Sequence, residues 1–508
     1  MLLFVAQTFA PPDYAVGTWY LRNGSQSHSG VQALKGAVTG PDIRCSYSGL
    51  SGEGDPLVAD INGDGLNEIV FASYSPTTLW AFRGSDCGVL WSSSIGSTGW
   101  GTAAVGELNP SIPGLEVVAT NWNGGVYAFR GTDGSLIWSR TLDSPYLQSS
   151  VVIADVDGDG YGEVFVHSTA RIYMLRGTDG STVWSFPLLG RYNSPAVYDV
   201  NLDSDYEVVA VDSSGTLWVF DARSGVVDYF VDIDTTEGSP AIADIDGDGS
   251  PDIVVGTKTG RVYAIDGLTD IVLWDVSIGM NNRAFPTIYD INDDGEVEVL
   301  IGDTDGDQVY ALRGIDGSVL WSYSRERSYE QAMARKIGDI DDDGDIEIII
   351  TSYGSRTGTS PMFVVLNGRT GTPEWSYDIA GKGLEGASIG DVDNDGCMEI
   401  IVVSDWTSGV GLKVFDSATP VSDCGVIGQR DPLNASEASS GAVYLRTEWT
   451  GGGLAVETGR TVWLSVYSSD GRLVRRLRVS GRALLDLPEG VYILKVEGHN
   501  LSETVISR

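Results

Sequence analysis

Four carboxylates lie within nine residues in the stretch Asp155-Val-Asp-Gly-Asp-Gly-Tyr-Gly-Glu163. Carboxylates this close repel one another, so they would destabilise a plain turn or strand. A hard cation such as Ca²⁺ removes this repulsion, because it binds oxygen ligands at alternate positions of a short loop. The side chains at positions 1, 3, 5 and 9 of the stretch therefore indicate a metal-binding loop.

The same pattern recurs in seven complete copies along the chain. Each copy has a carboxylate or amide oxygen at positions 1, 3 and 5 and a carboxylate at position 9. Oxygen donors without His or Cys favour Ca²⁺ over zinc or copper, so we expect up to seven calcium ions. The candidate ligands are Asp60, Asn62, Asp64 and Glu68; Asp155, Asp157, Asp159 and Glu163; Asp199, Asn201, Asp203 and Glu207; Asp244, Asp246, Asp248 and Asp252; Asp290, Asn292, Asp294 and Glu298; Asp339, Asp341, Asp343 and Glu347; and Asp391, Asp393, Asp395 and Glu399.

A further copy, from Glu107 to Glu116, is degenerate. It lacks an acid at position 5 and is one residue longer, so no metal is expected there. The alternative for the whole set is a family of Asx turns without metal, but seven copies that all end in an acid argue against it. Because the copies repeat in register, we expect calcium to be structural, and no catalytic residue is assigned among them.

The repeat also predicts the elements that hold the loops. Successive copies start 44 to 52 residues apart, a period typical of propeller blades. A short apolar strand precedes each loop, a second strand such as Glu163-Val-Phe-Val follows it, and a third such as Val126-Tyr-Ala-Phe leads to a fourth that usually carries Trp. These units predict an all-β chain with a single β-propeller of eight blades, or of seven as the alternative. The outer strand of the eighth blade is expected from the Cys424 region or from the segment around Trp19.

The repeat stops near residue 425, which sets the domain boundaries. Residues 11–425 are assigned to the propeller, 426–441 to a linker rich in Ser and Ala, and 442–508 to a small β-sandwich. Residues 1–10 are apolar and resemble the remnant of a signal peptide, although a positive n-region is missing; an ordinary apolar N-terminus is the alternative. No stretch is long and apolar enough for a transmembrane helix.

The formal charge of the 508 residues is -38, from 32 basic and 70 acidic residues. This charge argues against nucleic acid or an anionic membrane surface as a partner. The four cysteines fall as an N-terminal and a C-terminal pair, without the spacing of a zinc site. Two disulfides, Cys45 with Cys87 and Cys397 with Cys424, are one interpretation, and four buried thiols are the other.

Three parts of the sequence resemble known families. The loop pattern Asp-x-Asp-x-Asp-Gly-x-x-Glu followed by a strand resembles the FG-GAP/VCBS repeats of integrin-α-type calcium-binding propellers, over residues 55–420. The Val-Tyr-Ala-Phe…Asp-Gly…Trp half of each unit is similar to quinoprotein (PQQ-like) repeats. The segment Val466-Tyr-Ser-Ser-Asp-Gly-Arg-Leu-Val474…Leu487-Pro-Glu-Gly-Val-Tyr492 resembles the type IX secretion (Por) sorting domain. That resemblance implies export to an extracellular or cell-surface location.

Ligand binding is expected on the face opposite the acidic loops. The connections between blades vary most, and they carry cations and aromatic rings in an otherwise acidic chain. Cations there would bind the carboxylates or sulfates of an anionic polysaccharide, and pairing with nearby acids is the alternative. The candidate ligand-binding residues are Arg191, Tyr192, Arg283, Arg325, Arg327 and Lys382.

Three functions compete at this point. We favour an exported calcium-binding protein that acts in binding, adhesion or surface assembly, with an anionic polysaccharide, a surface protein or further copies of itself as partner. The second is a calcium-dependent polysaccharide lyase, because an eight-bladed calcium propeller resembles one rhamnogalacturonan lyase family. The third is a PQQ-type dehydrogenase, for which no cofactor motif can be singled out.

Overall fold

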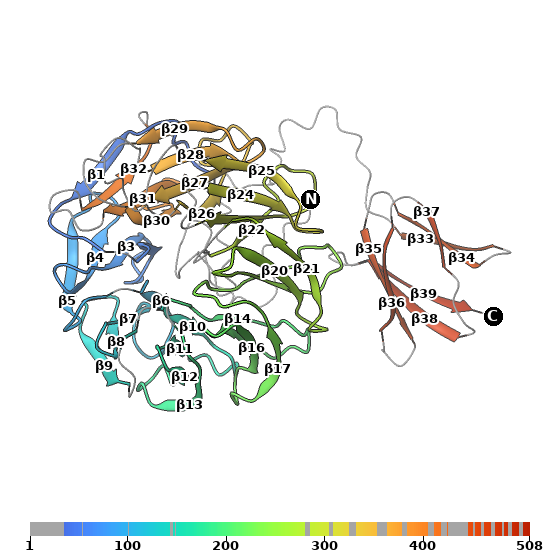
Figure 1. Ribbon diagram of the computed structural model, residues 1–508, viewed down its shortest axis with the longest axis horizontal. Coiled ribbons are helices and arrows are strands. Elements are labelled where there is room, and N and C mark those ends of the chain that lie inside the picture. The colour runs from blue at the N-terminus through green and yellow to red at the C-terminus, as the bar shows by residue number, and fades with distance from the viewer. Residues whose placement is uncertain are drawn as a thin grey trace. The chain divides into compact units, whose positions relative to one another are not determined.

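Eight four-stranded antiparallel sheets form a ring in the computed structural model of the chain (Figure 1). Each sheet is one blade, and the first strand of each blade lies nearest the centre of the ring. The all-β fold and the count of eight blades are therefore confirmed. Among the described residues, no helix is long and apolar enough to cross a membrane.

The structure describes most of the propeller and the strands of the C-terminal part. The described residues are 35–52, 54–99, 101–142, 146–147, 149–190, 192–279, 285–303, 308–324, 332–352, 363–377, 384–404, 411–417 and 424, with the strand backbones between 445 and 507.

Seven blades are continuous in sequence, with their strands in the order inner to outer. They are β2 (Leu57–Ala59), β3 (Glu68–Ala72), β4 (Thr78–Arg83) and β5 (Val89–Ser94); β6 (Ala104–Gly106), β7 (Glu116–Thr120), β8 (Gly125–Arg130) and β9 (Leu136–Thr141); β10 (Val152–Ala154), β11 (Glu163–His167), β12 (Arg171–Leu175) and β13 (Thr182–Pro187); β14 (Ala196–Tyr198), β15 (Glu207–Val211), β16 (Thr216–Asp221) and β17 (Val227–Asp232); β18 (Ala241–Ala243), β19 (Asp252–Gly256), β20 (Arg261–Asp266) and β21 (Val272–Ser277); β22 (Thr287–Tyr289), β23 (Glu298–Asp303), β24 (Gln308–Arg313) and β25 (Val319–Ser324); and β26 (Ala332–Gly338), β27 (Glu347–Ser352), β28 (Phe363–Asn367) and β29 (Pro373–Tyr377).

The eighth blade is assembled from both ends of the propeller sequence. Its inner strands are β30 (Leu384–Gly390), β31 (Glu399–Ser404) and β32 (Leu412–Phe415), and its outer strand is β1 (Ile43–Tyr47). The strand β1 pairs antiparallel with β32, and this pairing closes the ring. Of the two sources expected for this strand, the Cys424 region was wrong. The N-terminal part of the chain supplies the strand, but at Ile43–Tyr47, well after Trp19, which is outside the described residues.

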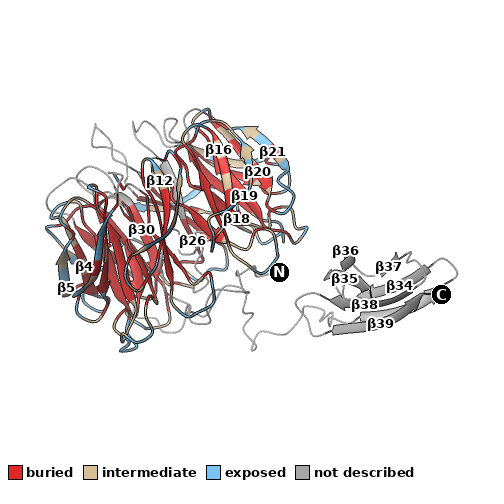
Figure 2. Cartoon of the chain, turned by 90° about the horizontal axis from the view of Figure 1, so that it is seen from below, coloured by how far each residue is buried: buried red, intermediate tan, exposed pale blue. Residues whose placement is uncertain are grey.

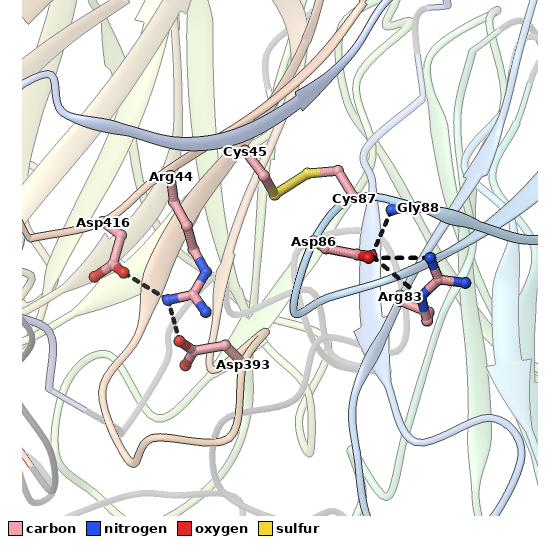
Figure 3. The surroundings of a disulfide bond; sticks show 8 residues. All are labelled: Arg44, Cys45, Arg83, Asp86, Cys87, Gly88, Asp393 and Asp416. Carbon is pink, nitrogen blue, oxygen red and sulfur yellow. Dashed lines mark hydrogen bonds and ion pairs between the residues drawn. A yellow bond between two sulfur atoms is a disulfide. The ribbon is translucent and has the colours of Figure 1, made fainter.

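Two disulfides are present, with the pairing that the spacing of the cysteines suggests. Cys45 of β1 is joined to Cys87, which follows the third strand of the first blade. Cys397 is joined to Cys424, 27 residues later. The first bond therefore links the closing strand of the eighth blade to the first blade (Figure 3).

The core of the propeller lies within and between the sheets (Figure 2). The second strand of a blade is covered on both faces, so its residues are apolar without alternation, as in Glu163-Val-Phe-Val-His167, where every residue is buried. The outer strands alternate between exposed and partly buried residues, as in β17. This gradient explains why the second strands give the clearest apolar signal in the sequence.

The repeated Trp residues connect neighbouring blades. Five indole N–H groups donate a hydrogen bond to a backbone carbonyl in the turn between the third and fourth strands of the next blade, whereas Nε1 of Trp375, in the seventh blade, has no partner among the described residues. These bonds run from Trp91 to Gly131, Trp138 to Gly177, Trp184 to Ala222, Trp274 to Gly314 and Trp321 to Gly368, at 2.6 to 2.8 Å. In the fourth blade the hydroxyl of Tyr229 makes the same bond to Gly267, at 2.7 Å. The aromatic repeat thus joins the blades, as the sequence predicts.

Gly131, which opens the turn of the second blade, lies against the preceding blade. A Cβ atom built on Gly131 would lie 2.2 Å from the carbonyl oxygen of Ile61 and 2.4 Å from that of Leu115. Both contacts are with backbone, which cannot move aside as a flexible side chain can. This turn therefore needs Gly131 for close approach of the blades, whereas the corresponding turn of the fourth blade has Ala222.

We expect Gly131→Ala to lower the free energy of unfolding by about 1–3 kcal/mol, because the added methyl forces two blades apart. Urea denaturation monitored by tryptophan fluorescence would measure this. Gly40→Ala is the matched control, since a Cβ there meets nothing within 4 Å. Equal stability of the two variants would contradict the packing argument.

The C-terminal unit, Arg430–Arg508, is separate from the first unit, Met1–Gln429. It contains two antiparallel sheets. One has the order β33-β34-β37 and the other the order β36-β35-β38-β39. Their strands are β33 (Leu445–Thr450), β34 (Gly453–Thr458), β35 (Val462–Ser468), β36 (Leu473–Val479), β37 (Arg482–Leu485), β38 (Gly490–Val496) and β39 (Leu501–Ser507).

Candidate metal centres

The acidic loops connect the first and second strands of their blades, and we number them 1 to 8 by blade. Loop 1 is 60–68, loop 2 is 107–116, loop 3 is 155–163, loop 4 is 199–207, loop 5 is 244–252, loop 6 is 290–298, loop 7 is 339–347 and loop 8 is 391–399. In an antiparallel blade, the connections between strands 1 and 2 lie at the same end as those between strands 3 and 4. All eight loops therefore lie on one face of the propeller, which we call the loop face.

Backbone N–H groups fix the acid side chains of each loop. In loop 3, Asp155 accepts hydrogen bonds from the N–H groups of Gly158 and Gly160, both at 2.8 Å. Asp159 accepts one from Tyr161 at 2.9 Å. These bonds are Asx turns, and they turn the carboxylates of positions 1, 3 and 5 toward the inside of the loop.

The turns require left-handed backbone at positions 4 and 6. In loop 3 these positions are Gly158 and Gly160, with φ of 74° and 86°. Loop 4 keeps the same conformation without glycine, since Leu202 has a φ of 60° and Ser204 a φ of 77°. A non-glycine residue in this region is strained, so the loop conformation is held by its hydrogen bonds even where the sequence does not favour it.

The closing acid of every loop has a second, structural role. It is the first residue of the second strand, and one of its oxygens accepts the N–H of the residue at position 2. The bonds run from Ile61 to Glu68, Leu108 to Glu116, Val156 to Glu163, Val200 to Glu207, Ile245 to Asp252, Ile291 to Glu298, Ile340 to Glu347 and Val392 to Glu399, at 2.7 to 3.2 Å. The degenerate loop 2 keeps this bond, so the acid is needed for the loop as well as for a metal.

Burial raises the pKa of the closing acids. The pKa of Glu163 rises to about 7 and that of Asp252 to about 8, because desolvation disfavours the charged form and the nearby loop carboxylates repel it. In loop 7 the pKa of Glu347 rises to about 10, again mainly through burial. The pKa of Glu399 is raised well above its ordinary value for the same reason. A divalent cation among the loop oxygens would offset both effects.

The oxygens fit a cation in four of the loops. One carboxylate oxygen from each of three acids lies within 4.8 Å of the others in loops 3, 5, 7 and 8. In loop 7, Oε1 of Glu347 and Oδ1 of Asp339 are buried without a hydrogen-bond partner among the described residues. In loop 8, the same holds for Oε1 of Glu399. A metal ion would satisfy such acceptors, and Oε1 of Glu116 in loop 2 is likewise buried without a partner among the described residues. The donor set is all oxygen, which suits Ca²⁺.

Two cationic side chains from the N-terminal segment reach loops 7 and 8. The ammonium of Lys35 lies 3.0 Å from Oδ2 of Asp339 and 2.8 Å from Oδ1 of Asp342. The guanidinium of Arg44 contacts Asp393 and lies 2.8 Å from Oδ2 of Asp416 (Figure 3). The segment that closes the ring therefore also lies against two of the acidic loops, which the sequence did not suggest.

The effect of burial on a closing acid can be tested in loop 2, where the sequence predicts no metal. Glu116 is fully buried, and desolvation raises its pKa to about 7, with a further rise from Glu107 and a small offset from Arg130. The pKa of Glu116 is higher in the folded state than in the unfolded state, so folding favours the protonated carboxyl. The contribution of Glu116 to stability is therefore fully present below about pH 4.5 and is lost as the pH rises through 7.

We expect Glu116→Gln to gain stability over the wild type as the pH rises from 5 to 9, reaching about 2–3 kcal/mol. The neutral amide oxygen can still accept the N–H of Leu108, at 2.8 Å in the wild type. Melting temperatures of both proteins across this pH range would show the crossover. A difference that does not change with pH would contradict the assignment.

Of the residues expected to bind a ligand, only Tyr192 is described. It borders a shallow pocket together with Tyr146, Ser149, His167 and Asn193. Tyr192 and Tyr146 both have left-handed backbone, with φ of 69° and 67°. Tyr146 is 45 % exposed and contacts Trp122 edge to face, with 4.9 Å between the ring centroids. The other candidates, Arg191, Arg283, Arg325, Arg327 and Lys382, lie outside the described residues.

Comparisons with known families match two parts of the propeller. Residues 123–286 match the family described as outer membrane protein assembly factor BamB. Residues 339–402 match the FG-GAP-like repeat, and this range contains loops 7 and 8. No curated protein matches the chain. The first of these families is a PQQ-type repeat family. The chain therefore combines features of PQQ-like and FG-GAP-like repeats, as its sequence motifs predict.

Comparisons with solved structures show the propeller fold. BamB from Moraxella catarrhalis is 16% identical, with a TM-score of 0.50, and the match covers 72% of this chain and 97% of that one. A quinohemoprotein alcohol dehydrogenase from Comamonas testosteroni is 12% identical, with a TM-score of 0.59 and coverage of 85% and 83%. A europium-containing methanol dehydrogenase is 11% identical, with a TM-score of 0.55 and coverage of 78% and 91%. At these identities the likeness is one of fold.

Proposed function

We propose that this chain is an exported calcium-binding β-propeller, in which calcium stabilises the loop face and the opposite face binds a ligand. The observation that carries the proposal is the convergence of loop carboxylates, some of them buried. Three acids converge within 4.8 Å in each of four loops, and oxygens of Glu347 and Glu399 are buried without a partner among the described residues. In this role calcium holds each loop closed and takes no part in a reaction.

Two further observations support export. The chain holds two disulfides, Cys45–Cys87 and Cys397–Cys424, and disulfides persist in oxidising compartments outside the cytosol. Calcium at millimolar concentration outside cells would fill sites of modest affinity. The resemblance of the C-terminal part to a secretion sorting domain points in the same direction, to an extracellular or cell-surface location.

An anionic polysaccharide is the ligand that fits the opposite face best. In the sequence, the candidate cations fall between the last strand of one blade and the first strand of the next, and their own placement is outside the described residues. Sugars also bind through aromatic rings, and Tyr146 and Tyr192 lie near each other at the end opposite the loop face, around Ser149 and His167. Attraction to a polyanion requires local cations, since the chain as a whole carries a charge of -38. A surface protein or a further copy of the chain is the alternative partner.

A glycan array of acidic polysaccharides, probed with the full chain in calcium, tests this assignment. We expect binding that Arg283→Ala and Arg327→Ala each weaken at least tenfold. Arg83→Ala is the charge-matched control, because Arg83 pairs with Asp86 at the loop face. Absence of binding by the wild type would overturn the glycan assignment. Release of unsaturated products would instead identify a polysaccharide lyase.

A further inference from the structure

The residue at position 3 divides the seven complete loops into two kinds. Loops 1, 4 and 6 have Asn there, and we call them the Asn loops. Loops 3, 5, 7 and 8 have Asp, and we call them the Asp loops. The two side chains have the same shape, but Asn carries a donor that Asp lacks.

In the Asn loops the amide satisfies the closing acid. Its Nδ2 donates to Oε1 of the closing Glu, at 3.0 Å in loop 1 and at 3.2 Å in loops 4 and 6. Its Oδ1 accepts the N–H of the residue at position 5, at 2.8 to 2.9 Å. Both ends of the amide are therefore used inside the loop, and the closing carboxylate has donors on both of its oxygens.

In the Asp loops the corresponding donor is missing. In loops 7 and 8 the closing acids Glu347 and Glu399 are 0 % exposed, and their Oε1 atoms have no partner among the described residues. The carboxylate at position 3 lies beside them, because Asp341 and Asp393 belong to the groups whose oxygens lie within 4.8 Å of one another. Loops 3 and 5 bring the acids at positions 1, 3 and 5 equally close.

From this difference we infer that the seven loops are not equivalent, and that the four Asp loops bind calcium tightly while the three Asn loops bind it weakly or remain closed without it. The inference rests on the calcium-binding function proposed above. An Asp loop offers four carboxylates to the ion and an Asn loop three, and calcium affinity rises with the number of charged ligands. Calcium must also break the bond between Asn and Glu before it can use both groups in an Asn loop.

Lys35 and Arg44 contact acids of loops 7 and 8, but they leave oxygens free to bind calcium, so we still expect these two loops to bind it tightly. Lys35 contacts Oδ2 of Asp339, whereas Oδ1 of the same carboxylate is buried without a partner among the described residues. Arg44 contacts Asp393 from the side of β1. Among the described residues, no Lys or Arg forms an ion pair with the acids of loops 3 and 5. We therefore expect loops 3 and 5 to be the tightest of the four.

The test counts the calcium ions that stay bound after gel filtration in calcium-free buffer, by elemental analysis of the full chain. We expect four ions in the wild type, five in Asn201→Asp and three in Asp157→Asn. Asn109→Asp is the matched control, because it adds the same charge at position 3 of loop 2, which lacks an acid at position 5. That variant is expected to keep four.

The outcomes separate this inference from the proposed function. Seven retained ions in the wild type, or four in both Asn201→Asp and Asp157→Asn, would overturn the division of the loops and leave calcium binding in place. No retained ions and no calcium-dependent change in melting temperature would overturn the calcium-binding function itself, and the inference with it. Asn292→Asp, in loop 6, gives the same test in a second blade if Asn201→Asp does not fold.

Discussion

Removing calcium with EDTA is expected to lower the melting temperature of the propeller by on the order of 10 °C. A ligand that binds the folded state alone contributes about 2.7 kcal/mol per site when its concentration is 100 times its dissociation constant. Four such sites sum to roughly 10 kcal/mol, which is large for any fold. The size of the propeller reduces the shift in degrees, because a longer chain has a larger entropy of unfolding.

The physical reason for this shift is the repulsion inside the loops. Without a cation, Asp155, Asp157 and Asp159 hold their oxygens within 4.8 Å of one another, and the closing Glu163 is buried beside them. Burial and the neighbouring loop carboxylates raise the pKa of Glu163 to about 7, so its protonation near neutral pH relieves part of the repulsion. On heating without calcium, these loops should therefore open before the rest of the propeller unfolds.

Differential scanning calorimetry with and without EDTA measures the effect. Addition of excess Ca²⁺ should restore the original melting temperature, and Mg²⁺ should restore less of it, because the smaller ion demands octahedral geometry and holds its waters. An unchanged melting curve after complete removal of calcium would show that hydrogen bonds alone hold the loops.

The sequence predicts the blades well because the signal for each blade is local. The acid at position 1, the closing acid and the apolar second strand fall within about 13 residues of one another, and they repeat. The strand bounds follow directly, as in loop 3, where the second strand begins at the closing acid Glu163. The positions of the candidate ligands within each loop could be read from the sequence for the same reason, and their binding of calcium stays a prediction.

The contacts that close the ring could not be predicted in this way, because they join residues far apart in sequence. Nothing in the short run Ile43–Tyr47 marks it as the partner of Leu412–Phe415. Likewise, the sequence gives Tyr229 no sign that it replaces Trp in bonding to the next blade. The same limit applies to the site, since the contact of Lys35 with Asp339 spans about 300 residues.

The second large effect on stability is expected at a buried ion pair, which could not be predicted from the sequence either. Lys336 of β26, in the seventh blade, lies 2.9 Å from Oδ2 of Asp55, which precedes β2 of the first blade. Both side chains are 0 % exposed. We expect Lys336→Met to cost about 3–5 kcal/mol of stability, because it removes the buried cation that faces the carboxylate of Asp55.

Urea denaturation of the full chain in calcium would measure this loss of stability. Two further variants show whether the loss comes from the buried charge. Arg83→Met breaks an ion pair whose side chains are 48% and 56% exposed, so it should cost less than about 1 kcal/mol. Adding Asp55→Asn to Lys336→Met also removes the charge of the buried carboxylate and should recover much of the lost stability. A packing defect caused by the change at position 336 would persist in the double variant. If Lys336→Met costs no more than Arg83→Met, the pair does not hold the first and seventh blades together. If the double variant recovers, the blades on either side of the closing one depend on an interaction between residues 281 positions apart.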